Sequence, residues 1–154
     1  MNDLQDLYAE VVMDHNRRPR NFKRIDDADR SAEGFNPLCG DQISLYLTMN
    51  AGDGIEDIGY VAAGCAISKA AASMMSEAVK GRSAEDARKV IENFRLLLTN
   101  NVGDDFDYEI LGDLEILEGV SSYPTRIKCA TLPVHTLASA LEDEGKSKAT
   151  VSTE

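Results

Sequence analysis

The chain is organised around residues 36–49, which read Asn36-Pro37-Leu38-Cys39-Gly40-Asp41-Gln42-Ile43-Ser44-Leu45-Tyr46-Leu47-Thr48-Met49. Pro37 and Gly40 mark a turn. From Ile43 onward apolar residues alternate with polar ones, which predicts a half-buried β-strand. In an extended segment residues two apart point the same way, so we expect the Cys39 thiol and the Asp41 carboxylate to face one spot. Together they would offer sulfur and oxygen to a metal ion.

A second strand follows this one. Ala51-Gly52-Asp53-Gly54 predicts a hairpin connection, and residues 55–62 predict the returning strand, which leads directly to Gly64 and Cys65. Because the two strands of a hairpin run antiparallel, Cys39 and Cys65 are expected at the same end of the pair.

Apolar residues at helical spacing predict helices over the rest of the chain. We expect them over residues 4–14, 66–80, 83–99, 113–120 and 130–141. Because of Pro133, the last helix is expected either to start near Ala130 or to be kinked there. Residues 26–34 are predicted to be irregular, and His15 to be a surface or capping histidine outside the site. The expected fold is α+β, a small antiparallel sheet with helices packed against it. Residues 1–141 would form a single domain, and residues 142–154 a disordered tail.

Charge and cysteine usage narrow the class of protein. The net charge of −11 argues against a nucleic-acid partner, which would require a basic surface. Seven acids and no Lys or Arg lie within residues 101–119, which predicts a solvated loop or a docking surface for a basic partner. The sequence shows neither a secretion signal nor a membrane span, and its three cysteines cannot all pair. We therefore expect a reducing, cytoplasmic location.

The cysteines suggest a metal site. Cys65 and Cys129 each precede a predicted helix, where the positive end of the helix dipole favours a thiolate. Cys39, Asp41, Cys65 and Cys129 together form a four-ligand set that suits zinc. Each of Lys69, Arg126 and Lys128 lies close to a cysteine in sequence. Their positive charges would offset the net negative charge of the metal site. The carboxylate is a harder ligand than a thiolate, so one coordination position of the site could open. That opening would free a thiolate to accept sulfur, or leave room for iron. The alternative is three unrelated, buried cysteines.

Three segments carry a resemblance to a known family. These are Asn36-Pro37-Leu38-Cys39-Gly40-Asp41, Gly64-Cys65-Ala66-Ile67-Ser68 and Arg126-Ile127-Lys128-Cys129-Ala130. The set resembles the IscU/NifU/SufU iron–sulfur cluster assembly proteins over about residues 4–141. Within that group it is more similar to the SufU type, because Lys128 replaces the histidine that precedes the last cysteine in IscU. It also lacks the IscU chaperone-binding motif and has the extra segment that ends in Leu111-Gly112-Asp113-Leu114-Glu115.

The resemblance implies a site and a reaction. It implies zinc held by Cys39, Asp41, Cys65 and Cys129, and a SufS-like cysteine desulfurase partner, with the SUF cluster-assembly complex beyond it. Persulfide sulfur would pass to Cys39, which leaves the zinc when the partner docks. Asp41 would retain zinc, and Arg126 would shape the charge nearby. The protein would then act as a zinc-dependent sulfurtransferase in iron–sulfur cluster assembly. The alternative is a scaffold on which Cys39, Cys65 and Cys129 bind iron or a [2Fe–2S] cluster before its transfer.

Overall fold

A computed structural model describes residues 3–142 and 149–152 of the chain. The alternating stretch forms strand β2 (Asp41–Met49), which lies between β1 (Arg30–Asn36) and β3 (Ile55–Ala63). Both neighbours run antiparallel to β2. Ile43, Leu45 and Leu47 are buried, whereas the residues between them are partly exposed, as their alternation predicts. The small antiparallel sheet of the expected α+β fold is confirmed.

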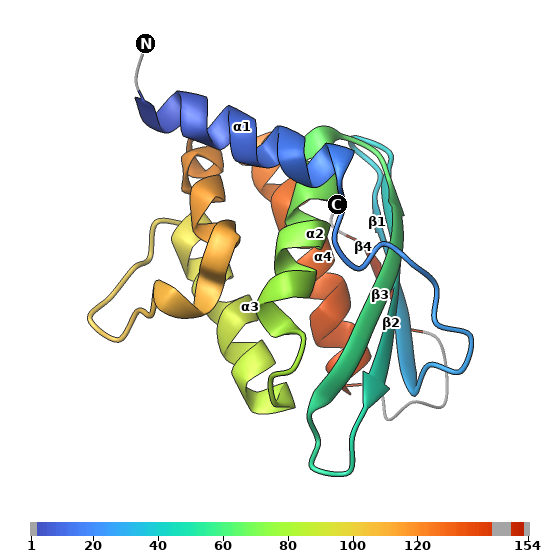
Figure 1. Cartoon of the computed structure of the whole chain (residues 1–154). Helices are drawn as coiled ribbons and strands as arrows, with labels where there is room; N and C mark the ends of the chain where they lie inside the picture. The colour runs from blue at the N-terminus through green and yellow to red at the C-terminus, as the bar shows by residue number, and fades with distance from the viewer. Residues whose placement is uncertain (1–2, 143–148, 153–154) are drawn as a thin grey trace.

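The helices cover one face of this sheet (Figure 1). They are α1 (Asp3–Arg17), α2 (Ala66–Val79), α3 (Ala84–Leu98), the 3-10 helix η1 (Glu109–Ser122) and α4 (Pro124–Glu142). Helix α4 packs on β1 and β2, and α2 packs on β3. Helices α1 and η1 pack on α2, and α3 packs on α4 and η1. The core lies between sheet and helices, and its largest members are fully buried: Tyr60, Phe94, Leu45, Leu47, Ile58, Met74, Leu97 and Leu114.

The expectations for residues 26–34, 113–120 and 142–154 require correction. Part of the segment predicted to be irregular, residues 26–34, belongs to β1, which pairs along its whole length with β2. The helix predicted over residues 113–120 is longer and has 3-10 geometry, with a kink at Gly112 (φ 55°, ψ −133°). The tail predicted to be disordered contains strand β4 (Ala149–Ser152), which pairs in parallel with β1. Residues 143–148 and 153–154 of that tail lie outside the described residues.

The acidic stretch at residues 101–119 leads into η1, and all seven of its carboxylate side chains are exposed. The apolar residues between them, including Ile110, Leu111, Leu114 and Leu117, face the core. None of the helices within residues 3–142 is long and apolar enough to cross a membrane.

Candidate metal centre

Cys39 and Asp41, which the sequence predicts to bind one metal ion, lie in and directly after the tight turn between β1 and β2. The turn is closed by a hydrogen bond from the Gly40 N–H to the Asn36 carbonyl, 2.8 Å long. Gly40 has a φ of 72°, so the segment is not extended as the sequence suggested. The Cys39 side chain is nevertheless exposed on the turn, and Asp41 is fully buried as the first residue of β2. The turn thus presents a thiol at the surface directly beside a buried carboxylate.

Cys65 reaches the same end of the sheet through the register of β3. Gln42 pairs with Ala63, so the chain leaves β3 level with Asp41. The Cys65 N–H donates to Asp41 Oδ1 at 2.8 Å, and the Cys65 Sγ lies 3.8 Å from Asp41 Oδ2. Cys65 also caps α2, because its sulfur accepts the Ser68 N–H at 3.4 Å. The predicted placement of Cys65 at a helix start, close to Asp41, is confirmed.

Gly64 makes this approach possible. Its φ is 132°, in the region that favours glycine. A Cβ atom at this position would lie 2.7 Å from Asp41 Cα and closer still to Asp41 Oδ1. Any other residue would therefore push β2 and the start of α2 apart.

Cys129 lies elsewhere on its helix than the sequence predicted. Helix α4 begins at Pro124, so Cys129 is in its second turn and does not lie at its start. Proline suits the first position of a helix, and Pro133, which suggested a later start, is accommodated inside the helix. The Cys129 thiol is fully buried and lies 3.7 Å from the Thr125 carbonyl, one turn back. Burial raises the pKa of this thiol, and the neighbouring Cys39 and Asp41 raise it further, so the expectation of a helix-stabilised thiolate is wrong for Cys129.

The three chain segments bring the predicted ligands together. The sulfur atoms of Cys129 and Cys39 are 3.3 Å apart. One ligand atom from each of Cys39, Asp41 and Cys129 lies within 4.8 Å of the other two, and Cys65 joins them through Asp41. In a tetrahedral zinc site with Zn–S bonds of about 2.3 Å, neighbouring sulfurs are about 3.8 Å apart. Small side-chain adjustments would therefore let these residues hold zinc, and the donor set fits the ion.

Asn36 belongs to this centre, although no pattern of residue types in the sequence marks its side chain. It is fully buried and donates through Nδ2 to Asp41 Oδ2 at 3.2 Å and to Cys129 Sγ at 3.5 Å. Its Oδ1 accepts the Leu38 N–H, which shapes the turn. Asn36 thus fixes the orientation of two ligands, as outer residues commonly do in metal sites. The only sequence signal for it was its place at the turn.

Arg126 lies beside the thiols, as the sequence suggested. The pKa of its guanidinium is raised, chiefly by a hydrogen bond to Cys129 and by negative charge on Cys65. Arg126 in turn lowers the pKa of the Tyr8 phenol, although burial outweighs it and leaves that pKa raised. Arg126 is exposed, so it supplies positive charge at the open side of the centre.

Comparison with known proteins decides the family. The profile of the NifU-like N-terminal domain matches residues 7–130. The chain belongs to this family. The NifU-like chain is 43% identical over 131 residues to the zinc-dependent sulfurtransferase SufU of Bacillus subtilis, covering 84% of this chain and 86% of that protein. It is 37% identical to the iron–sulfur cluster assembly scaffold protein IscU of Streptococcus pyogenes, covering 92% and 87% of the two chains.

A solved structure agrees with these sequence relatives. The crystal structure of FiSufU from Fervidobacterium islandicum superimposes with a TM-score of 0.80 at 33% identity. The match covers 86% of this NifU-like chain and 94% of that structure. The predicted family and fold are therefore confirmed, and they extend over most of the chain.

Proposed function

We propose that this NifU-like chain is a zinc-dependent sulfur acceptor of the SUF type, which takes persulfide sulfur from a cysteine desulfurase at Cys39 for iron–sulfur cluster assembly. The observation that carries the proposal is the contrast between its thiols: Cys39 is exposed on a turn, whereas Cys129 is buried. The relative named as a zinc-dependent sulfurtransferase supports the reaction class. Cys39, Asp41, Cys65 and Cys129 would hold the zinc ion, whose charge would keep bound thiols deprotonated.

Exposure decides which thiol meets the partner. A persulfide carried by another protein can reach Cys39 without opening the fold, but Cys129 is covered and Cys65 is half-buried at the cap of α2. Cys39 can also leave the ligand set most easily, because its turn is held by backbone and Asn36 hydrogen bonds that do not involve its sulfur. Asp41 is fixed by two hydrogen bonds and remains in place.

The transfer itself is a thiol–disulfide type exchange. The Cys39 thiolate attacks the outer sulfur of the desulfurase persulfide. A bond forms between Cys39 Sγ and that sulfur, and the bond to the desulfurase cysteine breaks, so that this cysteine leaves as a thiolate. The outer sulfur keeps its charge or proton, and no external oxidant or reductant is consumed. The Arg126 guanidinium lies where it can stabilise the anionic persulfide that results.

Persulfide mapping tests the proposal. The zinc-loaded protein is incubated with a SufS-like desulfurase and L-cysteine, alkylated, digested and analysed by mass spectrometry. We expect one added sulfur on the Cys39 peptide and stimulation of the desulfurase. Cys39→Ala should lose both, whereas Ser83→Ala, which alters only the cap of α3, should keep both. Persulfide on Cys65 or Cys129 alone, or full stimulation by Cys39→Ala, would overturn the proposal.

The second candidate is a scaffold for a nascent cluster, which the relative named as a scaffold protein supports. The same Cys39, Cys65 and Cys129 would then bind iron or a [2Fe–2S] cluster. Metal and acid-labile sulfide analysis of protein purified without oxygen separates the two functions. About one zinc per chain without sulfide favours the sulfur acceptor, and iron with matching sulfide favours the scaffold.

A further inference from the structure

A second group of metal-binding side chains lies among α1, α2 and η1. Its members are His15, Glu77 and Asp113, and one ligand atom of each lies within 4.8 Å of the other two. The sequence predicts a surface or capping position for His15, but its side chain is only 1% exposed. We propose that these residues form a binding site for a divalent transition-metal ion, distinct from the cysteine centre.

The ligands have the chemistry and mobility that such an ion requires. One imidazole and two carboxylates suit divalent manganese, iron, cobalt or zinc. His15 Nε2 lies 2.9 Å from Asp113 Oδ2 and 4.0 Å from Glu77 Oε1. In a tetrahedral site with bonds of about 2.1 Å the ligand atoms are about 3.4 Å apart. Asp113 would move out and Glu77 in by about half an ångström each, and both side chains are half-exposed and free to do so.

His15 is held by an outer hydrogen bond, as metal-bound histidines usually are. Its Nδ1 lies 2.7 Å from Ser73 Oγ, in the middle of α2. If Nδ1 donates to this oxygen, Nε2 is left as the metal ligand. Ser73 Oγ also accepts the Arg20 N–H at 2.9 Å, so its hydroxyl hydrogen must then point elsewhere.

The phenol of Tyr60 lies near this hydroxyl. Among the side chains that the structure describes, Tyr60 Oη is the buried polar atom without a hydrogen-bond partner. Burial raises the pKa of Tyr60 to about 12, and the nearby Ser73 hydroxyl opposes this rise. The Ser73 hydroxyl that holds His15 therefore lies near a buried oxygen that has no partner of its own.

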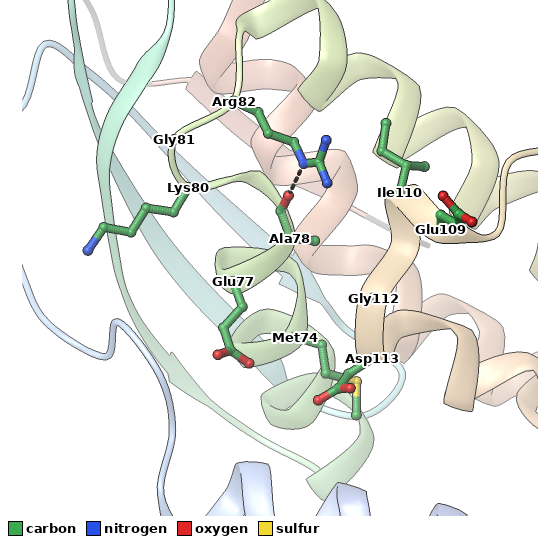
Figure 2. Close-up of a pocket in the computed structure, with 10 residues that line it drawn as sticks. All are labelled: Met74, Glu77, Ala78, Lys80, Gly81, Arg82, Glu109, Ile110, Gly112 and Asp113. Atoms are coloured by element: carbon green, nitrogen blue, oxygen red, sulfur yellow. Dashed lines mark hydrogen bonds between the residues drawn. The ribbon is translucent and has the colours of Figure 1, made fainter.

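The pocket beside these residues gives a cation access to them, and the nearby side chains carry a net negative charge. A pocket of about 510 Å³ opens onto the site, and Figure 2 shows the Glu77 and Asp113 carboxylates at the same end of it. Asp113 directly follows the kink at Gly112. Arg20 lies 3.8 Å from Glu77, but its stronger partner is Asp14, at 2.7 Å. Asp14 also pairs with Arg18, at 2.8 Å, so the carboxylates of Asp14, Glu77 and Asp113 outnumber these two guanidinium groups by one, and the site keeps a net negative charge that favours a cation.

Cobalt(II) tests the site in the zinc-loaded protein. The chain has two histidines, His15 and His135, so side-chain NMR can distinguish them. We expect Co²⁺ to shift and broaden the His15 imidazole signals first. The accompanying absorption should lack sulfur-to-cobalt charge-transfer bands, because the cysteine centre is already filled. Glu77→Gln and Asp113→Asn should each weaken Co²⁺ binding at least about tenfold.

The controls use neighbours that line the pocket or carry the other imidazole. Glu109→Gln and His135→Gln should bind Co²⁺ as the unmodified protein does. Glu77→Gln is the decisive variant, because Glu77 is half-exposed and its loss should leave the fold intact. The proposal is overturned if Glu77→Gln and Asp113→Asn bind Co²⁺ as tightly as Glu109→Gln, or if the His15 signals do not respond. The cluster would then be only a hydrogen-bonded contact between helices.

Discussion

Replacing Gly64 by alanine tests how closely the backbone must approach Asp41. The added methyl group would meet Asp41 Cα at 2.7 Å, which is backbone and cannot swing aside. The positive φ of 132° adds strain of about 1–3 kcal/mol, and forcing the two segments apart costs about another 1–3 kcal/mol. We expect a loss of about 2–6 kcal/mol from a domain stability of about 5–15 kcal/mol.

The matched control is Gly81→Ala. Gly81 also has a positive φ, 83°, but a Cβ there would meet nothing within 4 Å. Gly81→Ala should therefore lower the free energy of unfolding only by the backbone strain, about 1–3 kcal/mol. The difference between the two variants isolates the close approach of Gly64 to Asp41.

Urea unfolding, followed by circular dichroism with and without zinc, provides the measurement. Zinc at 100 times its dissociation constant should stabilise the protein by about 2.7 kcal/mol. Gly81→Ala should keep this gain, whereas Gly64→Ala should lose most of it, because displacing Asp41 and Cys65 disrupts the ligand set. Equal destabilisation of the two variants with equal gains from zinc would refute the reasoning.

Three further predictions concern Asn36, Tyr60 and Ser83. Asn36→Ala leaves Asp41 Oδ2 without its buried donor, so it should cost about 1–3 kcal/mol and weaken zinc binding about 10- to 100-fold in a chelator competition; unchanged zinc affinity would contradict this. Tyr60 has a folded-state pKa of about 12 against 10.0 unfolded, so the folded form holds the proton more tightly and stability should fall by up to about 3 kcal/mol as pH rises from 10 to 12. Urea titrations of Tyr60→Phe should lack that part of the decline, and a decline of the same size in the variant would count against it. Ser83→Ala removes the cap that accepts the Asp86 N–H at 3.0 Å, so it should cost about 1 kcal/mol in urea unfolding without altering zinc uptake, and a drop in zinc uptake would show that the cap reaches the metal centre.

Strand β1 shows why part of the fold escaped prediction. Its inward-facing residues are Ala32, Gly34 and Asn36, so the sequence lacks the large apolar residues that mark a strand. They are small because α4 lies directly over them: a Cβ on Gly34 would meet the side chains of Leu132 and Thr136. A buried strand is recognised in a sequence by its large apolar side chains. In β1 the inward-facing side chains are small, and α4 supplies the apolar surface that covers them.

Helix α4 shows a different limit. Proline in a helix interior costs about 3 kcal/mol, so Pro133 predicts either a helix that starts near Ala130 or a kinked one. The helix begins at Pro124 instead, and Pro133 is buried within it, so packing against the sheet and α2 offsets the local cost. The earlier start of α4 also affects the metal centre, because it places Cys129 inside the helix as a buried thiol with a raised pKa.

The sequence by itself determined the local features: the turn that carries Cys39, the hairpin that returns to Cys65, and helices α2 and α3. Each depends on residues within a few positions of one another, where turn chemistry and apolar periodicity act directly. Only the tertiary structure decided that Asn36 reaches Cys129, 93 positions away, and that His15 meets Ser73 and Asp113 across 58 and 98 positions. Such contacts depend on how the helices pack over the sheet, and no local pattern records which distant polar groups that packing will enclose.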